Sequence, residues 1–391
     1  MAGLGSVTNS TRAHDDLTPS RRNVQKERRE DHWCFAALFR FIPESGHRIS
    51  HYHRVRTANT MTTMETRPPR ASVIIPVRNR RDLLVRTLDA LDAQTYRDFE
   101  VVVVDDGSTD GAGELAAART VAGRPVRVLR NTGRGAVAAR TTAVHATTTP
   151  VLAFTDSDCE PDPDWLKAGM AAIGAGADLV HGRTIPERRI WPLERSVGQL
   201  DDGLFATCNA LYRRDAFEAA GGFDNTAAGR LGFRHDENVR DMGFGEDTLL
   251  GWRTVRRGAA VVYEPGALVR HHVFPADYRD QLSRAWSLGA FPTLLREVPE
   301  LQRTLVHHGV LFGPRDRRPV YATALALLSR RPIAVLAAGA WWAYTRGKEV
   351  RPAPTIPRHR KPVVLAQEMT IDVVAAVSLV AGSIRARKLL L

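Results

Sequence analysis

Four acidic side chains fall within seven positions directly after an apolar run at residues 151–155. The segment reads VLAFTDSDCEPDPDW and puts Asp156 and Asp158 in an Asp-x-Asp spacing. A buried strand cannot hold unpaired charges without a large desolvation cost. We therefore expect the strand to end here, with its acids at the rim of a sheet, facing a cation or a polyhydroxyl ligand.

A second acidic pair, Asp105 and Asp106, follows another apolar run in FEVVVVDDGSTDG (99–111). Each cluster alone is equally compatible with turns and helix caps, which Asp and Ser commonly form. Two clusters at successive strand ends favour a divalent-cation and nucleotide site instead. Mg²⁺ and Mn²⁺ prefer hard oxygen ligands and are often held by one or two carboxylates together with substrate phosphates.

The segments around these acids alternate between strand-like and helix-like patterns. Leu84, Leu88 and Leu91 recur at helical spacing, whereas FEVVVV is a continuous apolar run typical of a strand buried on both faces. The predicted strands are 71–77, 99–106, 126–129 and 151–155, and the predicted helices are 81–93, 111–122 and 135–146. This order predicts an α/β fold of βαβ units around a mostly parallel sheet. Ligands of such sheets bind beyond the carboxyl ends of the strands, where both acidic clusters fall.

The net charge of +12 is concentrated at the two ends of the 391-residue chain. Residues 1–70 carry a net +5, residues 71–314 a net −3 and residues 315–391 a net +10. A slightly acidic middle argues against nucleic-acid binding, which concentrates Lys and Arg on the working face. The basic C-terminal part is a better candidate for contact with anionic lipid.

The first 69 residues lack a sustained hydrophobic period and contain no typical signal-peptide segment. We expect them to be disordered or a mis-assigned extension, with Met61 or Met64 as the physiological start. The three cysteines are odd in number and lack CxxC spacing, which suits a reducing cytosol.

Six stretches in the middle of the chain resemble the family 2 glycosyltransferases of the GT-A fold, and they occur in the order found in that family. The resemblance covers residues 71–275. The six stretches are SVIIPVRNR (72–80), DFEVVVVDDGSTDG (98–111), NTGRGAVAAR (131–140), VLAFTDSDCEPDPDWL (151–166), NALYRRDAFEAAGGFD (209–224) and GEDTLLGWR (245–253).

The resemblance implies a donor site for a nucleotide sugar. Pro76 would line the nucleotide pocket, Asp106 would hydrogen-bond the base and Asp156 would lie near the ribose. Asp158 would bind a divalent cation, Mg²⁺ or Mn²⁺, that bridges the diphosphate. Such a cation stabilises the negative charge that develops on the leaving oxygen.

Asp247, in the Glu-Asp pair of GEDTLLGWR, is implied to be the general base that deprotonates the acceptor hydroxyl. Glu246, Arg253 and Arg140 would help to bind substrate. His271 would be a further metal ligand, with its neighbour His272 as the alternative. With one base and no protein nucleophile, the resemblance implies inversion by single displacement. A simpler explanation of Asp247 is an acid in the first turn of a helix with favourable end charges. A simpler explanation of His271 is a histidine of the protein core.

Two features depart from the pattern of the family. Leu249 stands where relatives often carry another acid. The stretch between Phe223 and Gly245 is charged and lengthened, and it could be an acceptor loop, a lid or a plain surface insertion.

Two apolar stretches of the C-terminal part, 333–344 and 371–384, are each shorter than the ~20 residues needed to cross a bilayer. Trp341, Trp342 and Tyr344 lie among arginines and lysines, a pattern typical of an element at a membrane interface. An ordinary helical extension that packs on the catalytic domain explains these residues equally well.

The sequence therefore predicts a cytoplasmic glycosyltransferase, at the cytoplasmic face of the membrane if the C-terminal part binds lipid. Its expected partners are a nucleotide-sugar donor and a saccharide or lipid-linked acceptor in cell-envelope or polysaccharide biosynthesis, and no nucleic acid. The expected divisions are the extension 1–69, a GT-A catalytic domain at 70–290 and a helical region at 291–391.

Two alternative functions stay open. A sugar-phosphate nucleotidyltransferase would carry a glycine-rich phosphate loop after the first strand, where PVRNRRDLL has no glycine. A non-catalytic saccharide-binding or scaffold protein of the same fold would not need the base, so the presence of both acidic motifs counts against it.

Overall fold

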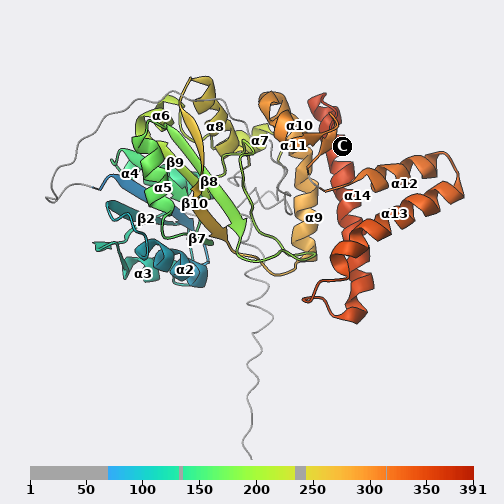
Figure 1. Cartoon of the computed structure of the whole chain (residues 1–391), viewed down its shortest axis with the longest axis horizontal. Coiled ribbons are helices and arrows are strands. Elements are labelled where there is room, and N and C mark those ends of the chain that lie inside the picture. Colours follow the sequence, from blue (N-terminus) through green and yellow to red (C-terminus); the bar gives the residue numbers. More distant parts are fainter. Residues whose placement is uncertain (1–68, 132–134, 234–243, 314) are drawn as a thin grey trace, which may run out of the picture. The chain divides into compact units, whose positions relative to one another are not determined.

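The computed structural model describes residues 69–131, 135–233, 244–313 and 315–391. The predictions for residues 1–68 and for the centre of the lengthened stretch, 234–243, lie outside the described residues. An eight-stranded sheet forms the centre of the described part, in the order β5-β2-β1-β6-β9-β8-β10-β7 (Figure 1). Its strands are β1 (Ala71–Val77), β2 (Phe99–Asp105), β5 (Arg127–Arg130), β6 (Val151–Thr155), β7 (Cys159–Pro161), β8 (Leu179–Pro186), β9 (Asn209–Arg213) and β10 (Val261–His271).

The sheet is mixed, and its parallel part is the one that the sequence predicts. The neighbours β5, β2, β1 and β6 all run parallel, as do β8 and β10. Strand β9 pairs antiparallel with both β6 and β8, and β7 pairs antiparallel with β10. The two acidic clusters lie at the carboxyl ends of β2 and β6, which are separated by β1. They therefore lie at the same end of the parallel strands, but not on adjacent strands.

Helices cover both faces of the sheet, because the side chains of each strand alternate between the faces. Val73, Ile75 and Val77 of β1 belong to a buried core with Leu84 of α2 and Trp165 of α5. Ile74 belongs to the core on the other face, together with residues of α4, α6 and α8. These helices are α2 (Arg81–Asp92), α4 (Ala136–Ala146), α5 (Trp165–Gly174), α6 (Arg214–Ala219) and α8 (Glu246–Arg256), and a short helix α7 (Ala227–Arg230) lies between α6 and α8 along the chain.

One predicted helix is shorter than the sequence suggests. The segment 111–122 forms only α3 (Ala112–Ala117), and a small hairpin of β3 (Thr120–Val121) and β4 (Arg124–Pro125) follows. Ala122 and Gly123 turn this hairpin with positive φ angles of 53° and 77°. A two-residue turn of this kind joins antiparallel strands with the right-handed twist that they prefer, which ends the helical pattern early.

The C-terminal region is helical, as predicted. It shares a buried core with α8 and with the segment that precedes β9. Phe291, Leu294 and Leu379 are buried together with Leu204 and Leu249. The region contains α9 (Tyr278–Ser287), η2 (Leu288–Ala290), α10 (Phe291–Glu297), η3 (Pro299–Leu301), α11 (Gln302–Leu305), β11 (Val306–His307), β12 (Leu311–Phe312), α12 (Arg318–Leu328), α13 (Pro332–Val350), η4 (Arg358–Arg360) and α14 (Lys361–Ala386). The proposed boundary at residue 290 stays a prediction.

Helix α14 is longer than either apolar stretch in the sequence. It is the helix in the described part that is long and apolar enough to cross a membrane, and 44% of its apolar window is buried. Its buried face carries Glu368 and Asp372, which pair with Arg315, and Asp372 also accepts from Arg346 and from the Trp342 indole. Buried charges need such partners, so this network ties α14 to α13 and to the segment before α12.

Candidate active site

The acids that end β2 have different partners. Asp105 Oδ1 accepts from the Ser108 backbone N–H at 2.8 Å, so this side chain closes the turn that follows the strand. Asp106 is fully buried, and its Oδ2 accepts at 2.9 Å from the N–H of Gly135, the residue at the start of α4. The turn-forming explanation thus applies to Asp105, whereas Asp106 links two strand-end loops. Pro76 lies one residue before the end of β1, opposite Val104 of β2.

Arg140 connects the acid after β6 with the acids that begin α8. Its guanidinium donates to Asp156 Oδ1 at 2.6 Å and lies 3.9 Å from Glu246 Oε1. All three side chains are at least nine-tenths buried. A buried arginine between two carboxylates compensates charges that could not be desolvated alone. The structure therefore brings Arg140, Asp156, Glu246 and the adjacent Asp247 into one cluster.

Glu246 and Asp247 occupy the first turn of α8, directly after Gly245, whose φ of 73° suits a glycine. The helix N-terminus favours negative charge at this position. Burial is the main cause that raises the pKa of Glu246, and the charge of Asp247 raises it further against the opposing effect of Arg140. Burial also raises the pKa of Asp247, against the backbone N–H of Thr248, which donates to Oδ1 at 2.7 Å, and the charge of Arg140.

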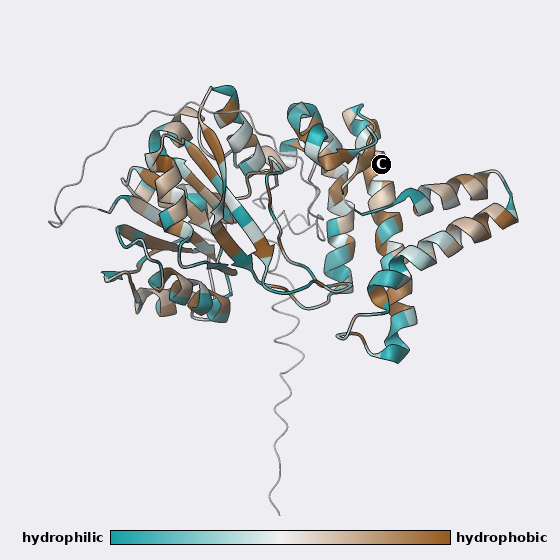
Figure 2. Ribbon diagram, in the orientation of Figure 1, coloured by the Kyte–Doolittle hydropathy of each residue, from teal (hydrophilic) through white to brown (hydrophobic). Residues whose placement is uncertain are grey.

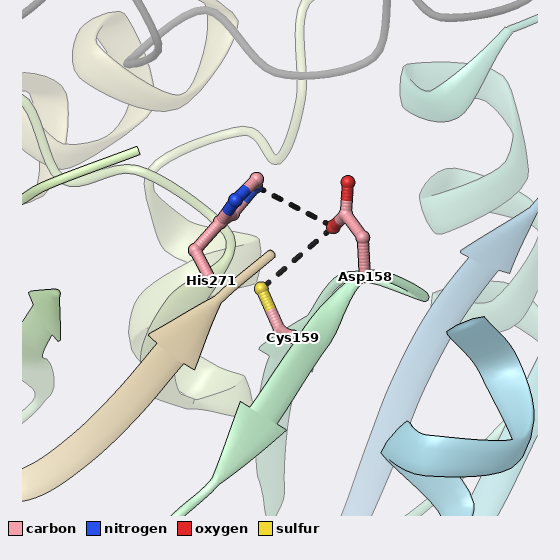
Figure 3. Close-up of side chains that lie close together, drawn as sticks. All are labelled: Asp158, Cys159 and His271. Carbon is pink, nitrogen blue, oxygen red and sulfur yellow. Dashed lines mark hydrogen bonds and ion pairs between the residues drawn. The ribbon is translucent and has the colours of Figure 1, made fainter. Parts of the chain in front are cut away.

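Asp158 lies in a separate buried group with Arg80, Cys159 and His271. His271 Nε2 lies 3.5 Å from Asp158 Oδ1, and Cys159 Sγ lies 3.8 Å from the same oxygen (Figure 3). Arg80 pairs with the other oxygen, Oδ2. Burial alone would raise the pKa of Asp158. When His271 is protonated, its positive charge and those of Arg80 and Arg195 outweigh burial and hold that pKa below its usual range.

The side chains of Asp158, Cys159 and His271 fit a divalent cation. One ligand atom from each lies within 4.8 Å of the others. The His271 ring is fixed by its other nitrogen, because Nδ1 donates to the His272 carbonyl at 2.8 Å. This hydrogen bond leaves the Nε2 lone pair of a neutral ring facing Asp158, as in histidines that bind metals.

The sequence did not indicate Arg195 or Phe274, and Arg80 was noted only as part of a matching stretch. The Phe274 ring lies against two guanidinium groups, with its centroid 4.7 Å from Arg80 Cζ and 3.8 Å from Arg195 Cζ. Arg80 follows β1 at the same edge as the acids, a position that could have been recognised. Arg195 comes from a stretch without a clear period, so nothing in its neighbourhood pointed to the site.

Arg253 lies further along α8 than the acids. Its guanidinium donates to the Gly222 carbonyl, and it also lies near Asp224. These contacts hold the turn after α6, and the predicted role of Arg253 in substrate binding stays a prediction.

A cavity in the described part lies at the opposite end of the parallel strands. It measures about 860 Å³ and is lined by Arg70, before β1, Val151, the first residue of β6, and Lys167 among others. The candidate acids follow the carboxyl ends of the strands, so this cavity is not part of their site.

Residues 72–221 match the family model for glycosyl transferase family 2. The chain carries a family 2 glycosyltransferase domain.

Two curated glycosyltransferases are similar to part of this chain. Glycosyltransferase AglE of Haloferax volcanii is 34% identical over 174 residues, which are 40% of this chain and 57% of AglE. Pre-mycofactocin glycosyltransferase of Mycobacterium tuberculosis is 32% identical over 253 residues, 58% of this chain and 47% of the relative. The chain thus spans about half the length of the curated relatives that it matches.

A solved structure shows the fold. The mannosyltransferase PcManGT from Pyrobaculum calidifontis, in complex with GDP-Man and Mn²⁺, superposes with a TM-score of 0.51 at 21% identity. The alignment covers 80% of this chain and 87% of that one. The predicted GT-A fold with its helical C-terminal extension is confirmed.

Proposed function

We propose that this protein transfers a sugar from a nucleotide-diphosphate sugar to an acceptor hydroxyl, with inversion and with the help of a divalent cation. The observation that carries the proposal is the contact of Arg140 with both Asp156 and Glu246. It joins the Asp-x-Asp segment, expected to bind the donor, to the helix that bears the expected base. The named activities of the relatives support the same reaction class.

Asp247 is the proposed general base. Its carboxylate accepts from the Thr248 N–H, which helps to keep it ionised although burial raises its pKa. The pKa of Glu246 is raised by burial and by the neighbouring charge of Asp247, so Glu246 is the member of the pair that keeps a proton more readily. One ionised and one protonated carboxyl side by side is an arrangement that suits proton removal from an alcohol near neutral pH.

The donor site is proposed to lie along the carboxyl ends of β1, β2 and β6. Pro76 and Asp106 would contact the nucleoside, Asp156 the ribose, and Asp158 with His271 would hold the cation. When bound, a divalent cation supplies positive charge against the leaving diphosphate. Arg80 and Arg195, which surround Asp158, would add fixed positive charge at the same place.

A panel of nucleotide sugars tests this function. The full chain should bind one or two of them more tightly when Mg²⁺ or Mn²⁺ is added, and should hydrolyse or transfer that sugar slowly. Isothermal titration with UDP- and GDP-sugars measures binding, and release of the nucleoside diphosphate measures turnover. A nucleotidyltransferase would instead release pyrophosphate from a nucleoside triphosphate and a sugar phosphate. A scaffold protein would bind saccharide without releasing any nucleotide.

The acceptor is proposed to be a saccharide or lipid-linked saccharide used at the cytoplasmic face of the membrane. The support comes from the hairpin of α12 and α13, whose turn end carries exposed apolar side chains. Figure 2 colours the ribbon by hydropathy and shows hydrophobic positions, in brown, beside this turn. Leu328 is 80% exposed and Ile333 is 82% exposed, with Arg330 and Arg331 between them. Exposed apolar residues flanked by cations, in a region with a net charge of +10, suit an anionic bilayer surface.

We expect the double substitution L328S/I333S to weaken binding to anionic vesicles at least about tenfold, because each apolar side chain gains about 1.5–3 kcal/mol on leaving water. Co-sedimentation with phosphatidylglycerol-containing vesicles at low salt measures this binding. Leu389→Ser, which replaces a leucine that is 60% exposed outside the hairpin, is the matched control. Equal binding by the double variant and the parent would remove the lipid proposal. A change in oligomeric state without a change in lipid binding would assign the hairpin to a second copy of the chain.

A further inference from the structure

We propose that Cys159 is a third protein ligand of the cation site, so that this site offers one carboxylate oxygen, one imidazole nitrogen and one thiolate sulfur. The inference rests on the proposed function, which assigns Asp158 and His271 to a divalent cation. It adds a soft ligand to a site that the sequence predicts to contain only harder ones.

The strand pairing places the thiol beside the imidazole. Cys159 begins β7, His271 ends β10, and these two residues are direct partners in the antiparallel ladder. Side chains of directly opposed residues in such a ladder lie on the same face of the sheet. Asp158 immediately precedes Cys159, so a single turn and a single strand pair deliver all three groups to one point (Figure 3).

The two distances from Asp158 Oδ1 to the other ligand atoms match those of a coordinated ion. Metal bonds of about 2.1 Å to oxygen and nitrogen and about 2.3 Å to sulfur, at tetrahedral angles, separate O from N by about 3.4 Å and O from S by about 3.6 Å. The corresponding distances from Asp158 Oδ1 are 3.5 Å to His271 Nε2 and 3.8 Å to Cys159 Sγ. Arg80 contacts the other carboxylate oxygen, so Oδ1 is the atom that faces both partners.

The His271 ring is also held by hydrogen bonds to its other nitrogen, as is usual for histidines that bind metals. His271 Nδ1 donates to the His272 carbonyl, and Ser196 Oγ lies 3.2 Å from the same nitrogen. His271 and Cys159 are both fully buried, which limits competition from water for the ligand atoms. Hydrogen bonds to the nitrogen that does not bind metal fix the orientation of the ring and its tautomer.

A thiolate changes which ions the site prefers. Thiolate and imidazole ligands favour Zn²⁺ and related transition ions, whereas Mg²⁺ prefers an all-oxygen set. We therefore expect Zn²⁺ and Co²⁺ to bind this protein more tightly than Mg²⁺. The bound ion releases the thiol proton to solvent, because sulfur binds metal as the thiolate.

Cobalt spectroscopy of the full chain, kept under reducing conditions, tests the inference without any measurement of activity. All proteins carry Cys34→Ser, since Cys34 lies outside the described residues. Adding Co²⁺ to this parent, with and without UDP or GDP, should produce a sulfur-to-cobalt charge-transfer band in the near ultraviolet. Cys159→Ser should abolish the band and weaken Co²⁺ binding at least about tenfold.

Cys208→Ser is the matched control, because Cys208 is also a buried thiol but contacts Thr184 Oγ1 at 3.8 Å and is not a member of the cluster. This variant should keep the band. If Cys159→Ser does not fold, ¹¹³Cd NMR of the parent protein decides the question, since thiolate ligation moves the cadmium resonance strongly downfield.

The outcomes separate this inference from the function on which it rests. Co²⁺ binding that is lost in Asp158→Asn but gives no sulfur band in the parent overturns the role of Cys159 and leaves the cation site in place. A parent that binds no Co²⁺ with either nucleotide overturns both the third ligand and the cation site. Binding of nucleotide sugars, measured separately by titration, then reports on the proposed function alone.

Discussion

Asp247→Asn should lower the rate of sugar transfer by about 10²–10⁴-fold, the range that a positioned general base contributes. The amide has nearly the shape of the carboxylate but cannot take a proton from the acceptor hydroxyl. Donor binding should stay within a few-fold of the parent, because the donor is expected to contact the other strand ends. Initial rates and donor titration of the same preparation measure the two effects.

Glu246→Gln provides the contrast at the neighbouring position. Burial and the charge of Asp247 raise the pKa of Glu246, so glutamine imitates its protonated form and should cost much less activity than Asp247→Asn. A larger loss in Glu246→Gln than in Asp247→Asn would assign the base to Glu246.

The raised pKa of Asp247 also sets the direction of the pH dependence. The base works only when ionised, so kcat/KM should rise with pH through the elevated pKa and should be lowest in acid. A pH–rate profile that is flat across the weakly acidic range would contradict this assignment.

Arg140→Met should destabilise the protein by about 3–5 kcal/mol near pH 8, the usual cost of removing one partner from a buried charge pair. Asp156 Oδ1 and Glu246 would lose the guanidinium that lies 2.6 Å and 3.9 Å away. Methionine keeps much of the arginine's length and packs well in a core, so the loss reports mainly on charge. Denaturant unfolding at pH 8 measures the effect.

The same variant should lose less stability at pH 5.5. Arg140 opposes the burial that raises the pKa values of Glu246 and Asp247, so its removal lets both rise further. Folded carboxyls with raised pKa values bind more protons than unfolded ones, and stability therefore falls as the pH rises through those values. The pH 5.5 sample retains the protons and most of the stability.

A second substitution tests the cause of that loss. Adding Glu246→Gln to Arg140→Met removes one of the uncompensated charges and should restore part of the lost stability at pH 8. If the double variant is no more stable than Arg140→Met, the arginine stabilises the fold through packing and not through charge.

Local patterns in the sequence were sufficient to predict most of the elements up to β6, and the end of the parallel strands at which the candidate acids lie. The apolar runs that end in Asp106 and Asp156 predicted both strand ends, because a chain cannot continue a buried strand through unpaired acids. The spacing of leucines along α2 predicted that helix for a similarly local reason. Only at Ala122 and Gly123 did a local turn shorten a predicted helix, and that signal was weak beside the alanines before it.

The partners of the site residues were decided by tertiary structure. Asp105 and Asp106 are adjacent residues of the same type, yet Asp105 closes a turn and Asp106 accepts a hydrogen bond from the Gly135 N–H. The second contact depends on where α4 begins. Arg140 meets Glu246 only because α4 and α8 cover the same face of the sheet.

The proposed cation site shows most plainly what the sequence alone could not predict. The sequence contains Asp158, Cys159 and His271, and it predicted the first and last of them as ligands from a family resemblance. It did not indicate the thiol, because Cys159 next to a strand looks like any small buried residue. The antiparallel pairing of β7 with β10 sets His271 opposite Cys159, and such a pairing depends on the packing of the whole sheet, which no short stretch of sequence encodes.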